Sequence, residues 1–416
     1  MSSKENLVKH PETETEEVEE IVDDEDDIVL DIDDDDDDDT KSVSSSSAAK
    51  NKMFKFMGII LAITILLLII LFVISSLKPK VYEFDDIEKI LKDAAISYFK
   101  DFPESLPQNE GSIIEIDSSN LVAAGKMKEL SEYTQEGVVC SGTVQVEKTG
   151  TDYLYTPYLN CGENYATVEL YKKITEGDIV TTGYGLYASG GSYVYKGEDV
   201  NNYLKLGKNT WRIVKINSDN SMVLISNELV GYGALWDDRY NETKSFEAGI
   251  NQYSVSRMHE YLDNIYTKPS EKEEDKEMIL SSADKTKLIP FNLCVGKRSQ
   301  GSEGKDGAIE CEQKLKNQKI GLLTVAEYMN ASLDPNCKNS VSKTCKNYNY
   351  LSKITNWWLV TGDKDDSSQV YVVNQTGKVA VSLGSNFYGV RPVVYLNSKA
   401  LYRGGNGTLE KPYLVK

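Results

Sequence analysis

Histidine is almost absent from this chain: the sequence of 416 residues contains only two, His10 and His259. His259 lies in a helical pattern between Met258 and Glu260. A general base needs a nucleophile beside it and a third group that orients it, and no such set can be assembled around His259. We therefore expect no catalytic residues and no cofactor, and we predict that the protein is not an enzyme.

The chain also lacks any C-x-x-C pair, and this absence, together with the scarcity of histidine, argues against a zinc site. Its cysteines are even in number and locally spaced, which predicts three disulfides and hence an oxidising compartment. The six residues are Cys140, Cys161, Cys294, Cys311, Cys337 and Cys345. Cys294 with Cys311, and Cys337 with Cys345, are expected to close loops.

An excess of positive charge is missing as well, because 65 acidic residues outnumber 46 basic ones. Outside residues 1–52 the other 41 basic and 45 acidic residues nearly balance, which gives no basic stripe and argues against nucleic acid as a partner. Residues 1–52 hold 20 of the acidic residues and only 5 of the basic ones. Such a segment cannot bury enough apolar surface to offset chain entropy, which predicts a disordered tail. It is either a solvated spacer or, through apolar residues such as Ile21 and Ile28, a docking segment for a basic cytoplasmic partner.

Charge is absent altogether from residues 56–77, FMGIILAITILLLIILFVISSL. At about 1.5 Å per residue this run would reach about 33 Å, enough to cross the hydrocarbon core of a bilayer. We predict a single transmembrane helix over residues 53–77 whose residues 56–77 contact lipid. The run is too long for a signal-peptide core and no A-x-A-like site precedes Lys78, so the anchor is expected to stay uncleaved.

The orientation of this predicted helix follows from cysteine rather than from charge. Lysines flank both ends equally, which leaves the positive-inside rule undecided. All six cysteines follow the helix, and their expected disulfides place that side outside the cytoplasm. The prediction is a single-pass cell-membrane protein with a cytoplasmic N-terminus and extracellular C-terminal domains.

The segment 81–175 reads as a helix followed by a small antiparallel sheet. Apolar residues spaced by three and four predict an amphipathic helix over 84–102. Residues 113–116 and 165–174 are expected to be strands, and 118–133 a short helix. Two alternating runs flank Gly150 and Thr151, which predicts a hairpin. In a hairpin centred there Cys140 faces Cys161, so these two residues are predicted to form a cross-strand disulfide.

From residue 178 to 416 the pattern changes to short strands, two or three helices and long loops. Helices are expected near 254–266 and 322–332, and the last long strand is expected over 388–398. This mixture predicts an α+β domain. The chain is thus divided into a tail over 1–52, a membrane helix over 53–77, a helix-and-sheet domain over 81–175 and a larger domain over 178–416.

Two resemblances accompany these patterns. A membrane helix that continues into an external helix and a small sheet resembles type IV pilins, and the phrases SSNLVAAGKMKEL, VVCSGTVQV and YTPYLNCGENYAT resemble pilin-like surface proteins of Gram-positive bacteria. This likeness covers residues 53–175. The chain lacks the processing motif of pilins, and this departure favours an uncleaved anchor over assembly into a fibre.

The second resemblance rests on the order of Trp211-Arg-Ile-Val, Leu224-Ile-Ser, Trp357-Trp358-Leu and Gly389-Val-Arg-Pro. This order resembles an uncharacterised family of bacterial cell-surface domains, which is distantly similar to the C-type-lectin-like fold of sulfatase-modifying proteins. The resemblance implies a lectin-like α+β domain with long loops over the C-terminal part of the chain.

The candidate ligand-binding residues are Trp357, Trp358 and Arg391. Adjacent aromatic rings could stack on sugars, although core packing is the ordinary role of such residues. Arg391 precedes Pro392, which holds it in an extended conformation, and its five donors suit either a structural partner, a carboxylate or loop carbonyls, or a ligand. We expect a membrane-anchored surface protein that binds a protein or glycan or has a structural role in the envelope. The alternatives are an enzyme related to sulfatase-modifying proteins and a pilin-like assembly component.

Overall fold

The computed structural model describes residues 57–70, 82–177, 179–267, 280–354 and 356–416. The chain divides into two units, Met1–Lys78 and Pro79–Lys416. The predicted acidic tail lies outside the described residues, as do both ends of the predicted membrane segment, whose residues 57–70 are helical. Among the helices that are described, none is both long enough and apolar enough to cross a membrane.

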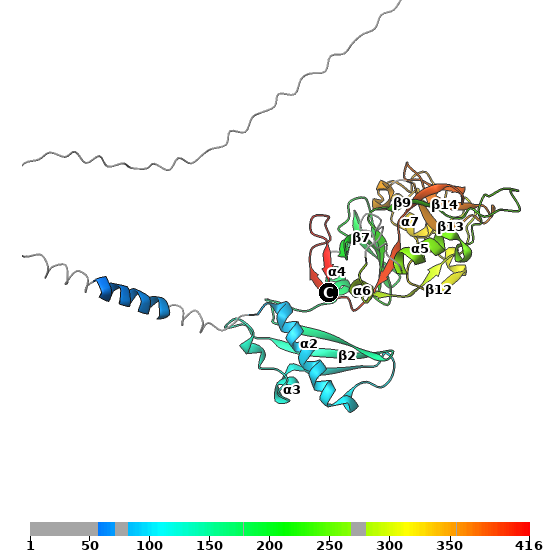
Figure 1. Ribbon diagram of the computed structural model, residues 1–416. Coiled ribbons are helices and arrows are strands. Elements are labelled where there is room, and N and C mark those ends of the chain that lie inside the picture. Colours follow the sequence, from blue (N-terminus) through cyan, green and yellow to red (C-terminus); the bar gives the residue numbers. More distant parts are fainter. Residues whose placement is uncertain (1–56, 71–81, 178, 268–279, 355) are drawn as a thin grey trace, which may run out of the picture. The chain divides into compact units, whose positions relative to one another are not determined.

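The unit Pro79–Lys416 is α+β, with short helices set among many strands (Figure 1). Its described α-helices are α2 (Phe84–Asp101), α3 (Ser118–Ala123), α4 (Leu170–Thr175), α5 (Arg257–Thr267), α6 (Ser282–Lys285) and α7 (Val325–Asn330). The first nine strands are β1 (Ile113–Asp117), β2 (Ser141–Thr149), β3 (Asp152–Asn160), β4 (Gly185–Ser189), β5 (Ser192–Lys196), β6 (Tyr203–Leu206), β7 (Asn209–Ile216), β8 (Met222–Ser226) and β9 (Val230–Leu235). The others are β10 (Leu288–Ile289), β11 (Phe291–Cys294), β12 (Lys314–Gln318), β13 (Trp357–Gly362), β14 (Gln369–Val373), β15 (Val379–Leu383), β16 (Phe387–Val390), β17 (Val393–Leu396), β18 (Tyr402–Gly404) and β19 (Tyr413–Val415).

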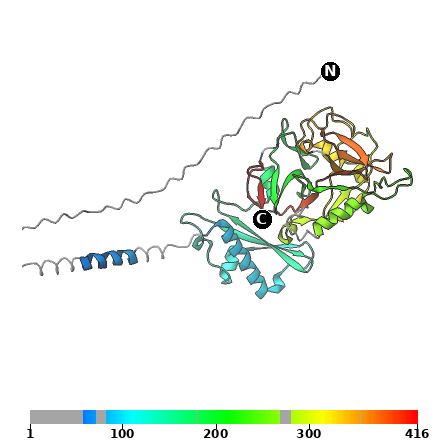
Figure 2. The ribbon, with the colours of Figure 1, turned by 45° about the horizontal axis from the view of Figure 1, so that its top comes forward.

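The helix α2 covers one face of the antiparallel sheet β1-β2-β3, as both views show (Figure 1; Figure 2). Its apolar stripe, which includes Leu91, Ala95 and Phe99, packs against Val144 and Val146 of β2. Acidic residues in its first turn and a lysine in its last turn interact favourably with the helix dipole and so stabilise the helix. The predicted helix over 84–102 is therefore confirmed, with its observed end at Asp101.

The hairpin β2–β3 has the predicted register. Thr149 pairs with Asp152 and Ser141 with Asn160, so the turn is centred between Gly150 and Thr151. Gly150 has a φ of 59°, a left-handed conformation that glycine adopts without a steric penalty.

Two larger sheets surround a second apolar core, which the residues from Leu170 to Ala400 build. One sheet has nine strands in the main order β10-β17-β8-β7-β6-β19-β18, with β5 beside β7 and β4 beside β5. The other has five strands in the order β15-β14-β13-β16-β9. The helix α7 begins at a capping box of Thr324 and Glu327 and presents Val325 and Met329 to this core.

One predicted strand is wrong. Residues 165–174 were expected to extend the small sheet, but the helix α4 occupies the end of this segment. Leu170 and Ile174 are both buried in α4, and their spacing of four residues places them on one helical face. The alternating residues that precede them suggest a strand only locally, and packing against the larger core decides the outcome.

The predicted long strand over 388–398 is also corrected, because it consists of two strands that belong to different sheets. β16 pairs with β9 and β13, whereas β17 pairs with β8 and β10. Arg391 and Pro392 form the junction between them. Proline has no backbone N–H. The chain can therefore change sheets at Pro392 without leaving a backbone donor unpaired there. The Pro392 carbonyl accepts a hydrogen bond from the Ser226 N–H.

Candidate functional site

Trp357 and Trp358 begin β13, and both side chains are completely buried, with 0 % exposure. Neighbouring residues of a strand face opposite sides of the sheet, so burial of both rings shows that β13 is covered on both faces. The indole N–H of Trp357 donates to the Ile354 carbonyl at 3.1 Å, and that of Trp358 donates to the Ala234 carbonyl at 2.9 Å. Both residues pack the core, and a role in ligand binding stays a prediction.

Arg391 is buried as well, with 2 % exposure. Its Nε donates to the Ser226 carbonyl at 3.0 Å and its Nη1 to the Leu351 carbonyl at 3.5 Å. Its guanidinium lies 4.9 Å from the ring centroid of Trp357. Burial, and then the nearby charge of Arg212, lower the pKa of Arg391 to about 9, so it remains protonated at neutral pH. The structure thus pairs Arg391 with carbonyls at the junction of the two sheets.

Replacing Arg391 with methionine is expected to lower the melting temperature, with a loss of about 1–3 kcal/mol in the free energy of unfolding. The substitution leaves the buried Ser226 and Leu351 carbonyls without their donor. Arg391→Lys is the matched control, since it keeps the charge but not the planar fork, and it should recover only part of the loss. Melting curves followed by circular dichroism measure both variants. An Arg391→Met protein that melts like the wild type would contradict this structural role.

All three predicted disulfides are present. The Cα atoms are 4.1 Å apart in Cys140–Cys161, 4.4 Å in Cys294–Cys311 and 4.5 Å in Cys337–Cys345, and none of the six cysteines is free. The pair Cys140–Cys161 closes the open end of the β2–β3 hairpin, because it continues the register of the last strand pair, Ser141 with Asn160.

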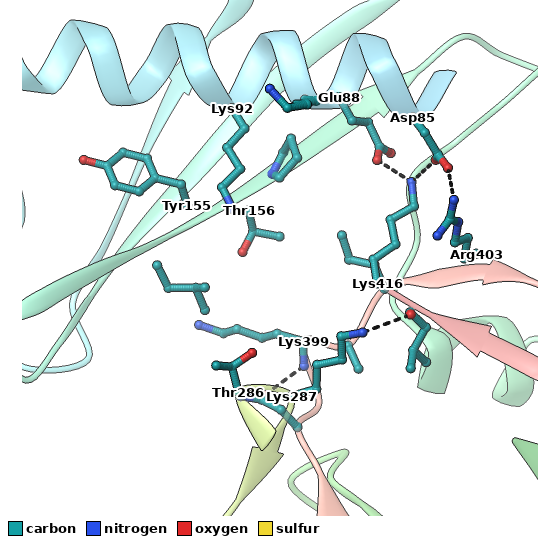
Figure 3. A pocket seen from close by; sticks show the side chains of 17 residues that line it. Asp85, Glu88, Lys92, Tyr155, Thr156, Thr286, Lys287, Lys399, Arg403 and Lys416 are labelled. Atoms are coloured by element: carbon teal, nitrogen blue, oxygen red, sulfur yellow. Dashed lines mark hydrogen bonds and ion pairs between the residues drawn. The ribbon is translucent and has the colours of Figure 1, made fainter. Parts of the chain in front are cut away.

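A pocket of 530 Å³ lies between α2 and the C-terminal strands, and we call it the α2 pocket. Its walls come from α2, from β3 around Tyr155 and Thr156, from Thr286 and Lys287 before β10, and from the chain that follows β17. Figure 3 shows Lys92 reaching from α2 toward Thr156, with Lys287 and Lys399 across the same space. This volume is typical of sites for small ligands.

One end of the α2 pocket is closed by a network of ion pairs. The Lys416 ammonium contacts the carboxylates of Asp85 and Glu88, and Arg403 pairs with Asp85 at 3.1 Å. Glu88 also accepts a hydrogen bond from the Tyr165 hydroxyl at 2.7 Å. The hydrogen bond from Lys416 holds the pKa of Asp85 below its usual range. Burial opposes the charge of Lys416, but its hydrogen bonds to these carboxylates raise its pKa overall.

The other cations of the α2 pocket differ in how they are compensated. Lys89 pairs with Asp93 at 2.6 Å, and Lys399 pairs with Glu147. Lys92, by contrast, has no carboxylate partner within the described part of the chain. Lys287 likewise has none among the described residues, where its ammonium donates only to the Val415 carbonyl, at 3.3 Å. Within the described part of the chain, the pocket therefore presents two lysine charges that no side-chain carboxylate compensates.

The sequence did not predict the lysines of the α2 pocket, because no local sequence pattern links them to one another. Lys92 occupies an ordinary position of an amphipathic helix, and Lys287 and Lys399 stand in separate loops far along the chain. Only the packing of α2 beside the chain end brings them together. In the sequence, the basic residue at position 92 cannot be distinguished from the exposed Lys100 of the same helix, which does not line the pocket.

Comparison with known proteins finds one family model, described as a domain of unknown function (DUF6273), which matches residues 219–398. The matched part runs from just before β8 through β17, and it contains Trp357, Trp358 and Arg391 but not α2. It is consistent with the resemblance to an uncharacterised domain family and shows no specific fold. No curated protein and no solved structure matches the chain.

Proposed function

We propose that this chain is a membrane-anchored bacterial cell-surface protein that binds a ligand outside the cytoplasm. The observation that carries the proposal is the pairing of all six cysteines into disulfides, because disulfides persist in oxidising compartments. The charge-free residues 56–77 supply the anchor, with the acidic tail on the cytoplasmic side. A basic cytoplasmic partner of that tail is part of the same proposal.

The ligand would occupy the α2 pocket rather than an aromatic platform. A platform needs an exposed ring face, and Trp357 and Trp358 have none. The α2 pocket has the volume of a ligand site and two lysines that no described side-chain carboxylate pairs with. The larger part of the unit, with its mixed sheets and long loops, suits a lectin-like display domain, and α2 on the sheet β1-β2-β3 suits a pilin-like stalk.

Binding is favoured over the enzymatic alternative by the state of the cysteines. A relative of formylglycine-generating, sulfatase-modifying proteins would need a reactive thiol pair, whereas every cysteine of this chain lies in a disulfide. The second alternative, a pilin-like assembly component, requires processing before the apolar run. Recovery of the full-length chain from membranes with its acidic tail intact would exclude that alternative.

The topology is tested with a membrane-impermeant maleimide on intact cells that express the full chain. The native cysteines should react only after a reductant is added, because they are oxidised and outside the membrane. Ser44→Cys is the control, since this cysteine lies in the tail and should react only after the cells are lysed. Native cysteines that react without reductant, or that need lysis, would refute the proposed location.

A further inference from the structure

The charges that line the α2 pocket do not cancel. Among the described residues, six cationic and two acidic side chains line it. Lys416 and Arg403 neutralise the two carboxylates, Asp85 and Glu88. Lys89 and Lys399 are neutralised by carboxylates just outside the pocket. Lys92 and Lys287 remain without a side-chain counter-charge among the described residues, so the pocket favours an anionic ligand group.

We infer that the α2 pocket binds a phosphate monoester carried on a sugar or a polyol. A phosphate monoester has a charge of about −1.5 to −2 at neutral pH and three acceptor oxygens, which suits a pocket that has Lys92 on its α2 wall and Lys287 on the wall before β10. Lysine binds phosphate as a point charge, without the bidentate geometry that arginine offers to phosphate and carboxylate alike. Arg403, the one arginine at this pocket, is already paired with Asp85.

The rest of the lining suits the remainder of such a ligand. Thr156, Thr286 and Asn397 also line the pocket, and hydroxyl and amide groups of these types can bond sugar hydroxyls. Leu154, Pro157 and Leu401 also line the pocket and supply apolar surface for the carbon faces of a sugar. The volume of 530 Å³ exceeds what a phosphate group alone would fill. The inference deepens the proposed function by naming its ligand class, and it rests on that function only in treating the protein as a binding protein.

The test is calorimetric titration of glucose 6-phosphate into the purified full chain in a non-ionic detergent. Binding is expected for glucose 6-phosphate and not for glucose. It should weaken as salt is added, because the contacts are ionic, and as the pH falls below about 6, where the ligand gains a proton. Lys92→Gln and Lys287→Gln should each weaken binding about tenfold or more.

Lys100→Gln is the matched control, because it removes one exposed charge from α2 without touching the pocket. It should bind glucose 6-phosphate like the wild type. Melting curves of all variants check that lost binding does not reflect lost folding. Equal binding by Lys92→Gln and Lys100→Gln would overturn the site, and equal binding of glucuronate would overturn the phosphate assignment. Tighter binding of a short-chain phosphatidic acid would overturn the sugar in favour of a lipid headgroup. The calorimetric titration uses purified protein, so a negative result there would contradict the ligand class. A negative result in the maleimide experiment would instead contradict the proposed location.

Discussion

Replacing Arg298 with methionine is expected to lower the free energy of unfolding by about 3–5 kcal/mol at neutral pH, since the change leaves a buried carboxylate without its counter-charge. Arg298 and Glu310 are 1 % and 0 % exposed, and Nη1 of Arg298 lies 3.4 Å from Oε1 of Glu310. Arg298 also donates from Nη2 to the carbonyls of Glu303 and Gly304, at 3.0 and 2.8 Å. Urea denaturation of the purified chain measures the loss.

The effect of Arg298→Met should depend on pH in a defined direction. Burial raises the pKa of Glu310 above its usual range, and the charge of Arg298 opposes this shift. Without Arg298 the folded-state pKa rises further above the unfolded value. An acid whose folded pKa is raised destabilises the fold above that pKa, and the penalty disappears as the pH falls toward the unfolded value. The difference from wild type should therefore be large at about pH 8 and smaller at about pH 5.

Two further variants separate charge from packing at this pair. Glu310→Gln keeps the shape and leaves Arg298 bonded to its two carbonyls, so it should cost less than Arg298→Met. The double variant Arg298→Met with Glu310→Leu removes both charges and should be more stable than Arg298→Met alone. A loss for Arg298→Met that is below about 1 kcal/mol, or that is independent of pH, would show that the pair is not coupled as described.

Replacing Trp358 with alanine is expected to cost about 3–5 kcal/mol of stability, because it opens a large cavity in the core. The ring of Trp358 is completely buried and lies between Trp236, at a centroid distance of 5.9 Å, and Tyr388, at 4.9 Å. Its indole N–H satisfies the Ala234 carbonyl of β9. Trp358 thereby ties β13 to β9 and β16 within one sheet. Urea denaturation again provides the measurement.

Two control variants separate the effect of the cavity from the effect of the lost hydrogen bond and from the loss of an exposed aromatic side chain. Trp358→Phe keeps much of the ring and loses the N–H, so it should cost clearly less than Trp358→Ala. Tyr240→Ala removes an aromatic residue that is 55 % exposed, and it should change stability by less than about 0.5 kcal/mol. If Trp358→Ala were as stable as wild type but lost ligand binding, the sugar-stacking interpretation of this residue would replace the core role.

Helices and hairpins that are encoded by a short stretch of consecutive residues could be predicted from the sequence. The amphipathic period of α2 and the turn at Gly150 are encoded by neighbouring residues, and the hairpin register followed from the turn alone. That register in turn placed Cys140 opposite Cys161. Segments that depend on distant partners were less predictable. Residues 165–174 read locally as a strand, yet Leu170 and Ile174 pack as a helix against the larger core.

The sequence by itself determined the α+β class of the unit Pro79–Lys416, its leading helix, its hairpin and its three disulfides, because each depends on local periodicity or on short cysteine spacings. Only the tertiary structure decided where the functional candidates lie. It buried both tryptophans, placed Arg391 at a junction between two sheets, and set Lys92 of α2 and Lys287 on two walls of one pocket. These outcomes depend on strand order and on packing between segments hundreds of residues apart, which local patterns do not encode.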